Sequence, residues 1–160
     1  MPTGQRLMRN GSAEAPPIKL GGALHDIGKI GIPDRVLGKT SKLDDQEYEL
    51  IKQHPSKGGR ILEGIKSVKL IPILPCIVHH HESYDGSGYP DGLVGDDIPV
   101  LARIISIADT FDAMTTDRPY RKGLDVSVAI AELQKCAGSQ FDLKLVHEFV
   151  AMIRETGLKI

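Results

Sequence analysis

The chain contains no tryptophan and few other aromatic residues, with three phenylalanines and four tyrosines among its 160 residues. Its core must therefore be built from aliphatic side chains, and apolar residues make up 41% of the composition. Such a composition is typical of a globular protein rather than a disordered one, and the length suits a single domain.

Cysteine, net charge and long apolar runs are also scarce. Cys76 and Cys136 lie in segments expected to be helical and lack a metal-type spacing, so we expect two reduced thiols in a cytoplasmic protein. The formal net charge of −1 gives no reason to expect a nucleic acid polymer as a partner. No apolar run reaches membrane-spanning length, and no secretory signal pattern is present.

Glycine and proline, by contrast, are plentiful, with 17 and 10 copies that divide the chain into short segments. Residues 83–98 are rich in both and predict a long loop, which is usually functional inside a compact domain. Helical periodicity and capping residues predict helices over residues 18–27, 44–54, 55–63, 68–82, 100–116, 125–138 and 142–157. We therefore predict an all-α bundle over residues 18–160, preceded by an irregular segment at residues 1–17.

Residues 79–90, with the sequence HHHESYDGSGYP, are the most unusual segment. A helix end that needed only a cap would use one glycine or asparagine, whereas clustered imidazoles suit a metal site. A second polar cluster, His25-Asp26, lies upstream with Lys29 one turn later. Taken alone, the His25-Asp26 pair could equally be a solvated pair at a helix terminus.

Asp109 interrupts the apolar run of residues 104–114 and shares a helical face with Ile105 and Ala108. A buried carboxylate without a partner is costly, so we expect a cation beside it. A metal ion is one candidate, and a salt bridge to Arg103 or Arg118 is the other. Asp112 competes with Asp109 as the functional carboxylate.

Several motifs occur together in one order: LHDIGKIGIP (24–33), HP (54–55), HHESYDGSGYP (80–90), ARIISIADTFDAM (102–114), RPYR (118–121) and QFD (140–142). This ordered set resembles the HD-GYP domain, a bacterial branch of the HD metal-dependent phosphohydrolases. The resemblance implies an HD-domain-like helical bundle with a long glycine-rich loop. It also implies hydrolysis of cyclic di-GMP to pGpG or GMP by attack of a metal-bound hydroxide on phosphorus.

The resemblance further implies six metal ligands, namely His25, Asp26, His54, His80, His81 and Asp109. In it His79 is a spare histidine, and Glu82 orients a ligand from outside the coordination sphere. Six imidazole and carboxylate ligands suit two divalent ions, with iron or manganese favoured over zinc or nickel. A third ion is not expected.

Four further residues are implied to contact the substrate: Lys29, Tyr89, Arg118 and Arg121. Lys29 and Asp26 are also expected to act in catalysis. From the residues alone other interpretations stay open, because Lys29 and the two arginines could be surface cations and Tyr89 could be structural.

The family's first helices carry a glutamate and a histidine, and neither has a counterpart before His25. We therefore expect an N-terminally truncated domain. Its expected partners are a cyclic dinucleotide, an upstream sensor or receiver domain and a diguanylate cyclase domain. A non-catalytic cyclic di-GMP sensor with an incomplete metal site is the alternative to the enzyme, and a hydrolase of another nucleotide is a second alternative.

Overall fold

The computed structural model describes residues 15–67, 70–117 and 121–157, and these ranges are helical without a β-strand. The all-α prediction is confirmed. The elements are α2 (Ala15–Leu24), η1 (Ile27–Gly31), α3 (Asp34–Leu37), α4 (Asp45–Ile51), α5 (His54–Gly64), η2 (Ile71–Ile73), α6 (Leu74–His79), η3 (Gly95–Asp97), α7 (Val100–Thr115), α8 (Val126–Lys135) and α9 (Leu143–Thr156). None of the described helices is both long and apolar enough to cross a membrane.

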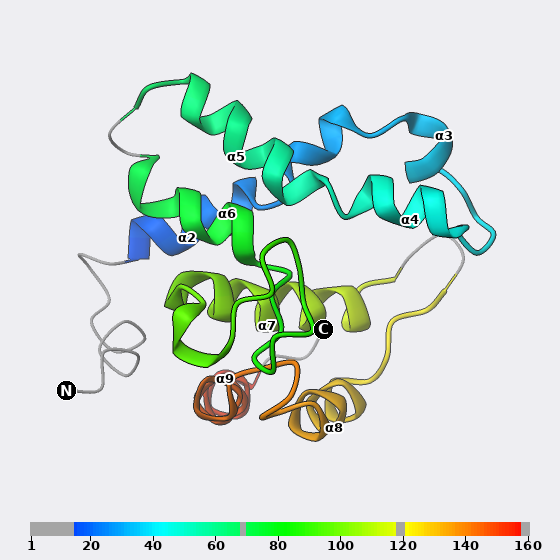
Figure 1. Ribbon diagram of the computed structural model, residues 1–160. Helices are drawn as coiled ribbons and strands as arrows, with labels where there is room; N and C mark the ends of the chain where they lie inside the picture. The colour runs from blue at the N-terminus through cyan, green and yellow to red at the C-terminus, as the bar shows by residue number, and fades with distance from the viewer. Residues whose placement is uncertain (1–14, 68–69, 118–120, 158–160) are drawn as a thin grey trace.

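Helix α7 runs through the middle of the molecule, with α2, α5 and α6 on one side and α8 and α9 on the other (Figure 1). Its two faces serve two separate hydrophobic cores. Ile104, Ile107 and Phe111 pack into the core shared with α8 and α9. Ala102 and Ile105 pack into the core shared with α5 and α6. Because both cores include residues of α7, this helix sets the positions of α5 and α6 on one side and of α8 and α9 on the other.

Local sequence explains where several helices begin. The Glu47 amide donates to the Asp44 carboxylate at 2.9 Å, and the Asp44 amide donates to Glu47 at 3.0 Å, which completes the predicted capping box of α4. The side chains of Asp125 and Asp142 cap α8 and α9 by accepting hydrogen bonds from amides of the first helical turn. Helix α9 ends at Gly157, whose φ of 59° is the left-handed conformation that glycine adopts readily.

Two predicted helices differ from the observed ones. Helix α2 covers residues 15–24 instead of 18–27, because the chain turns at His25-Asp26 and continues as the 3₁₀ helix η1. The helix expected over residues 68–82 is split into η2 and α6, each with a proline in its first turn. Both changes leave histidines just beyond a helix end.

The long loop between α6 and α7 is fixed to the C-terminal helices. The amide of Tyr84 donates to the Gln140 carbonyl at 3.0 Å, and that of Asp85 donates to the Ser139 carbonyl at 2.9 Å. Residues 139–140 lie in the turn between α8 and α9 (Figure 1). The predicted loop is therefore confirmed, with the short helix η3 near its end.

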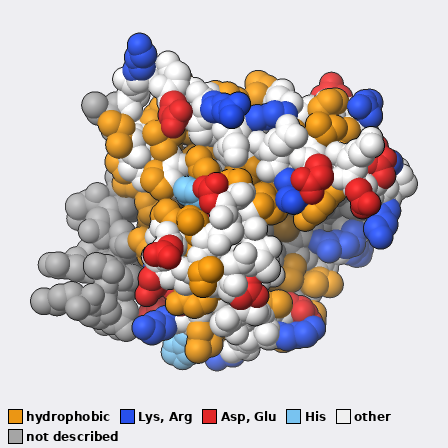
Figure 2. All heavy atoms as spheres, in the orientation of Figure 1, with side chains coloured by type: hydrophobic (Ala, Val, Ile, Leu, Met, Phe, Trp, Pro, Cys, Tyr) orange, Lys and Arg blue, Asp and Glu red, His pale blue; other side chains and the backbone are white. Residues whose placement is uncertain are grey.

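Charged side chains of both signs are interspersed over the face shown in Figure 2, together with apolar ones. This mixed surface agrees with the net charge of −1.

Helix η1 approaches the start of α5 very closely at Gly28. A Cβ atom on Gly28 would lie 1.8 Å from the carbonyl oxygen of His54 and 2.5 Å from the amide nitrogen of Gly58. Only glycine allows this approach, which holds the segment carrying Asp26 against the helix that begins with His54.

We predict that Gly28→Ala separates η1 from α5 and lowers the free energy of unfolding by about 1–3 kcal/mol or more. Gly22→Ala is the matched control, because a Cβ there meets nothing within 4 Å and alanine favours the helix by roughly 0.5–1 kcal/mol. Urea unfolding of the metal-free proteins checks both. Equal stability of the two variants would contradict the close contact at Gly28.

Candidate metal centre

Four segments bring histidines and carboxylates to one place. His25 and Asp26 follow α2, and His54 begins α5 just after α4. His80 and His81 follow α6, and Asp109 projects from α7. On α7, Asp109 continues the stripe of Ala102 and Ile105 that faces α5 and α6. The six predicted ligands therefore come from segments far apart in the sequence.

The four imidazoles form a tight group. The Nε2 atoms of His54 and His80 are 3.3 Å apart, and the ring centres of His80 and His81 are 4.2 Å apart. The ring centre of His25 is 5.1 Å from that of His80. His54 and His80 are each only 1% exposed, so they form the floor of the site.

The two carboxylates close the group at its more exposed side. An Asp26 oxygen lies 3.2 Å from Nε2 of His54 and an Asp109 oxygen 3.4 Å from Nε2 of His25. Ligand atoms of His54, His80 and His81 lie within 4.8 Å of one another, as do those of His25, Asp26 and His80. The two groups share His80, which is an arrangement that suits neighbouring ions.

Three of the histidines are held in the same way. Nδ1 of His25, of His54 and of His80 lies 2.7, 2.7 and 2.8 Å from the backbone carbonyl three residues earlier. Those carbonyls belong to the last turns of α2, α4 and α6, where helices leave carbonyls without partners. Since each Nδ1 donates its proton to a carbonyl, the neutral form of each ring carries its lone pair on Nε2, which faces the centre of the group.

Several ligand atoms of the resulting group lack a hydrogen-bond partner. Nε2 of His54 and Nε2 of His80 are both acceptors yet lie 3.3 Å apart, and neither can donate to the other. Nε2 of His25 and one oxygen of Asp26 are buried without a hydrogen bond. A divalent metal ion would satisfy all of these atoms, so the residues fit the metal that the family implies.

The protonation states agree with metal binding. Burial lowers the pKa of His80 to about 3, and burial together with the neighbouring His54 lowers the pKa of His81 to about 4. Both rings are therefore neutral at pH 7, as ligands must be. The His25 imidazole, whose Nε2 lies 3.4 Å from an Asp109 oxygen, lowers the pKa of Asp109. Burial opposes ionisation of Asp26, but the neighbouring His54 imidazole and Lys29 ammonium outweigh burial and lower the pKa of that carboxyl.

His25 behaves differently, because the Asp109 carboxylate, 3.4 Å from its Nε2, raises the pKa of His25. Asp109 thus favours a proton on His25 in the metal-free protein. A metal ion bound to Nε2 would replace this proton.

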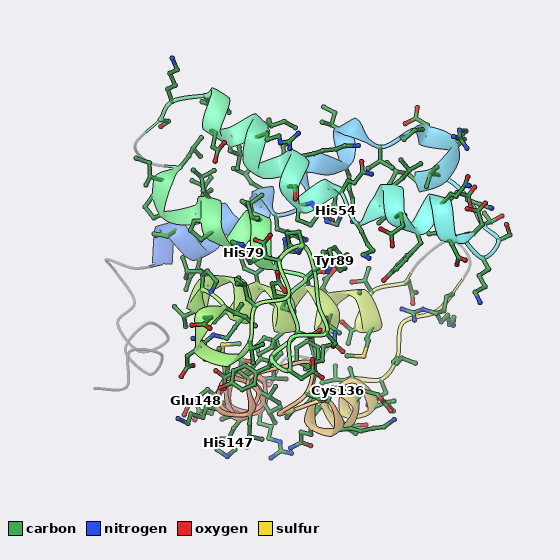
Figure 3. All side chains as sticks on the ribbon, in the orientation of Figure 1. His54, His79, Tyr89, Cys136, His147 and Glu148 are labelled. Atoms are coloured by element: carbon green, nitrogen blue, oxygen red, sulfur yellow. The ribbon has the colours of Figure 1, made fainter. Side chains whose placement is uncertain are left out.

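Lys29 and Tyr89 also lie at the group, as predicted. The Lys29 ammonium is 2.5 Å from an Asp26 oxygen. The Tyr89 ring stacks on His81 with ring centres 4.9 Å apart and an angle of 21° between the planes. In Figure 3 the labelled Tyr89 and His54 lie close together above α7. Their expected contacts with a substrate stay predictions.

Glu82 and His79 both organise the loop. The buried Glu82 carboxylate accepts hydrogen bonds from the amides of Asp91 at 2.7 Å and Leu93 at 3.1 Å. These contacts hold the loop that carries Tyr89, and they are not the contact with a ligand histidine that we expected for Glu82. Nε2 of His79 lies 2.9 Å from the Asp91 carboxylate, so His79 is directed to the loop rather than to the other histidines.

Two of the alternatives considered for Asp109, an ion pair with Arg103 and the use of Asp112 instead, are not supported, and the third, Arg118, lies outside the described residues. Arg103 pairs with Asp142 at 2.7 Å and with Asp96 at 2.6 Å, so it is not the partner of Asp109. Asp112 is exposed and accepts a hydrogen bond from the Thr116 hydroxyl.

Of the two arginines expected to contact the substrate, Arg118 lies outside the described residues. Arg121 is exposed, and its guanidinium donates to the Ala113 carbonyl at 2.5 Å. Its expected role therefore rests on the family resemblance and stays a prediction.

Tyr48 and Lys52 lie at the edge of the site and are not among the residues predicted from the sequence. The Lys52 ammonium lies 5.8 Å from the centre of the Tyr48 ring and 5.6 Å from that of Tyr89. The spacing of four residues between Tyr48 and Lys52 puts both on one side of α4, and Lys52 comes just before His54. This four-residue separation is the sequence feature from which the pair could have been predicted.

The chain matches the family model described as an HD domain over residues 6–145. It is 42% identical over 134 residues to the cyclic di-GMP phosphodiesterase PA4108 of Pseudomonas aeruginosa, which covers 84% of this chain and 32% of that protein. It is 40% identical over 147 residues to the 3'3'-cGAMP-specific phosphodiesterase 2 of Vibrio cholerae, which covers 88% of this chain and 28% of that protein. The chain thus spans about a third of the length of the curated relatives it matches.

Solved structures show the same fold. A cyclic GMP-AMP specific phosphodiesterase of Vibrio cholerae superposes with a TM-score of 0.66 at 19% identity, over 94% of this chain and 42% of that one. Bd1817 of Bdellovibrio bacteriovorus, described as a HDG"Y"P protein, also has a TM-score of 0.66, at 23% identity over 86% of this chain and 43% of that one.

The chain therefore belongs to the HD-domain family of metal-dependent hydrolases. Within that family it is a member of the HD-GYP branch, whose motif it carries at residues 80–90. The resemblance inferred from the sequence is confirmed.

We predict that His80→Ala removes most bound metal, because it deletes the donor shared by both groups of ligand atoms. The control is His79→Ala, which deletes a neighbouring imidazole directed at the loop. Elemental analysis after purification measures the result. Wild-type metal content in His80→Ala, or an equal loss in both variants, would contradict the ligand assignment.

We also predict that the metal-free protein loses stability as the pH falls from about 6.5 to about 4.5. The folded-state pKa values of His80 and His81 lie below the ordinary value, so the unfolded chain binds more protons in this range. Each histidine adds up to about 1.4 kcal/mol per pH unit to the slope.

The test variant is His81→Gln. Its free energy of unfolding should depend less steeply on pH, because the difference in bound protons between the unfolded and folded states falls by nearly one. His147→Gln is the control, because His147 is exposed on α9 and lies far from the site in Figure 3. Urea unfolding across the pH range measures the slopes, and an unchanged slope in His81→Gln would refute the prediction.

Proposed function

We propose that this chain is the catalytic domain of a metal-dependent phosphodiesterase that hydrolyses cyclic di-GMP to pGpG, GMP or both. The observation that carries the proposal is the set of inward-facing Nε2 lone pairs on His25, His54 and His80, closed by two carboxylates. The names of relatives at about 40% identity support a cyclic dinucleotide as the substrate class.

The proposed ligands are His25, Asp26, His54, His80, His81 and Asp109, and the proposed metal is iron or manganese. Two divalent ions bound there would polarise a phosphodiester and activate water for in-line attack on phosphorus. Asp26 would hold metal together with His54 and with His25, since its oxygens lie 3.2 Å from Nε2 of His54 and 3.5 Å from Nε2 of His25.

Other side chains would bind and orient the substrate. Lys29 holds Asp26 and leaves a positive charge at the edge of the site, where it can approach a phosphate oxygen. Tyr89, stacked on His81, presents its ring beside the ligands. Arg118 and Arg121 are retained as proposed phosphate contacts on the strength of the family resemblance.

The proposal extends to the surrounding protein. We assign the catalytic domain to residues 18–160 and expect a sensor or receiver domain upstream in the full-length parent. Docking of a diguanylate cyclase domain onto the glycine-rich loop would couple synthesis and degradation of the same messenger.

The deciding experiment combines elemental analysis with a cyclic di-GMP turnover assay on one anaerobically purified sample. We expect about two iron or manganese ions per chain together with hydrolysis. Asp109→Asn should reduce both, while Asp112→Asn, an exposed carboxylate on the same helix, should change neither.

Full metal content without hydrolysis of cyclic di-GMP or cGAMP would contradict the proposed phosphodiesterase activity. Binding of either nucleotide in that case would favour the alternative, a non-catalytic cyclic dinucleotide sensor.

A further inference from the structure

The ammonium of Lys52 lies at the edge of the candidate metal centre, held between two tyrosines. It is 5.6 Å from the ring centre of Tyr89 and 5.8 Å from that of Tyr48, within the range of a cation–π contact. Tyr89 in turn stacks on His81. Lys52 thus contacts the ring that stacks on a proposed metal ligand.

The charge of Lys52 is available to a ligand. Its carboxylate partner is Glu49, at 2.9 Å, and Glu49 is 64% exposed. An ion pair so open to water is worth little and can be exchanged for a better one. Lys29, by comparison, is held by Asp26, which belongs to the proposed metal ligands.

A cyclic dinucleotide contains two phosphodiesters in one ring. Only one of them can lie at the metal centre for cleavage, and the other remains a full negative charge a short distance away. Removing that charge from water requires a nearby cation.

We propose that Lys52 binds the phosphodiester that is not being cleaved, with Tyr48 and Tyr89 fixing the position of its ammonium. This inference rests on the proposed function, because it takes a cyclic dinucleotide as the ligand. Lys52 then distinguishes substrates with two phosphodiesters from those with one. It lies outside the residues that the family motif brings to the site.

The chain offers a matched pair of variants. Lys52→Met removes the ammonium and keeps much of the side-chain volume, and Lys52→Arg keeps the charge and the cation–π contacts. Lys135→Met is the control, because Lys135 on α8 also pairs with a glutamate three residues earlier but lies in the layer away from the site (Figure 1). All three are measured in the full chain beside the wild type.

The first measurement is calorimetric binding of cyclic di-GMP to the metal-free proteins, which needs no turnover. The loss of a charge-assisted hydrogen bond should weaken binding by Lys52→Met about tenfold or more. Lys52→Arg should bind within about threefold of the wild type, and Lys135→Met should match it.

The second measurement is hydrolysis by the metal-loaded proteins of cyclic di-GMP and of bis(4-nitrophenyl) phosphate, which has a single phosphodiester. Lys52→Met should raise KM for cyclic di-GMP far more than it lowers kcat. Its activity on bis(4-nitrophenyl) phosphate and its metal content should equal those of the wild type.

Wild-type affinity and KM in Lys52→Met would overturn the inference. So would equal losses on both substrates, or loss of metal, because Lys52 would then act on the metal centre itself. If the wild type binds cyclic di-GMP without hydrolysing it, the proposed function fails, while weaker binding by Lys52→Met would still support this contact. A wild type that binds no cyclic di-GMP, with or without metal, would overturn both.

Discussion

Three hydrogen bonds of one kind determine the chemistry of this protein. Three histidines stand at or beyond the ends of helices α2, α4 and α6, and each donates from Nδ1 to a carbonyl of the last helical turn. The helix gains a partner for a carbonyl that would otherwise lack one, and the histidine gains a fixed ring with Nε2 directed away from the helix. The same contact thus caps the end of a short helix and orients a histidine as a metal ligand. The ends of these short helices are therefore part of the site.

Helix α7 combines these donors with a carboxylate. Its lower face belongs to the core formed with α8 and α9, and its upper face belongs to the core formed with α5 and α6. Asp109 lies where the upper apolar stripe reaches the histidines, so the helix that joins the two cores also closes the site. The loop that carries Tyr89 is fixed at two places, by hydrogen bonds to the Glu82 carboxylate and by hydrogen bonds to the carbonyls of residues 139–140.

Much of this could be predicted from the sequence, for identifiable reasons. The helices at residues 100–115 and 143–156 follow from periodicity and from capping residues close in sequence. The histidine cluster follows from a motif too unusual to be structural, and Asp109 follows from its place on an apolar face. The contact of Lys52 with Tyr89 could not be predicted, because it depends on how α4 lies against a distant loop. Likewise, the early end of α2 depends on the close approach of η1 to α5 at Gly28, which local propensity does not encode.

The dependence of both cores on α7 has a consequence for the order of events during folding. His25 and Asp109 are far apart along the chain, and contacts over such separations form late because closing a long loop costs entropy before any contact compensates for it. A chain in which α4, α5 and α6 have already assembled presents the imidazoles of His54, His80 and His81 without a carboxylate from α7. His54, His80 and His81 by themselves form an all-nitrogen group, which would favour metals late in the Irving–Williams order. Asp26, just before η1, and Asp109, on α7, would add hard oxygen ligands to that group, so the metal preference of the site would depend on how α7 docks.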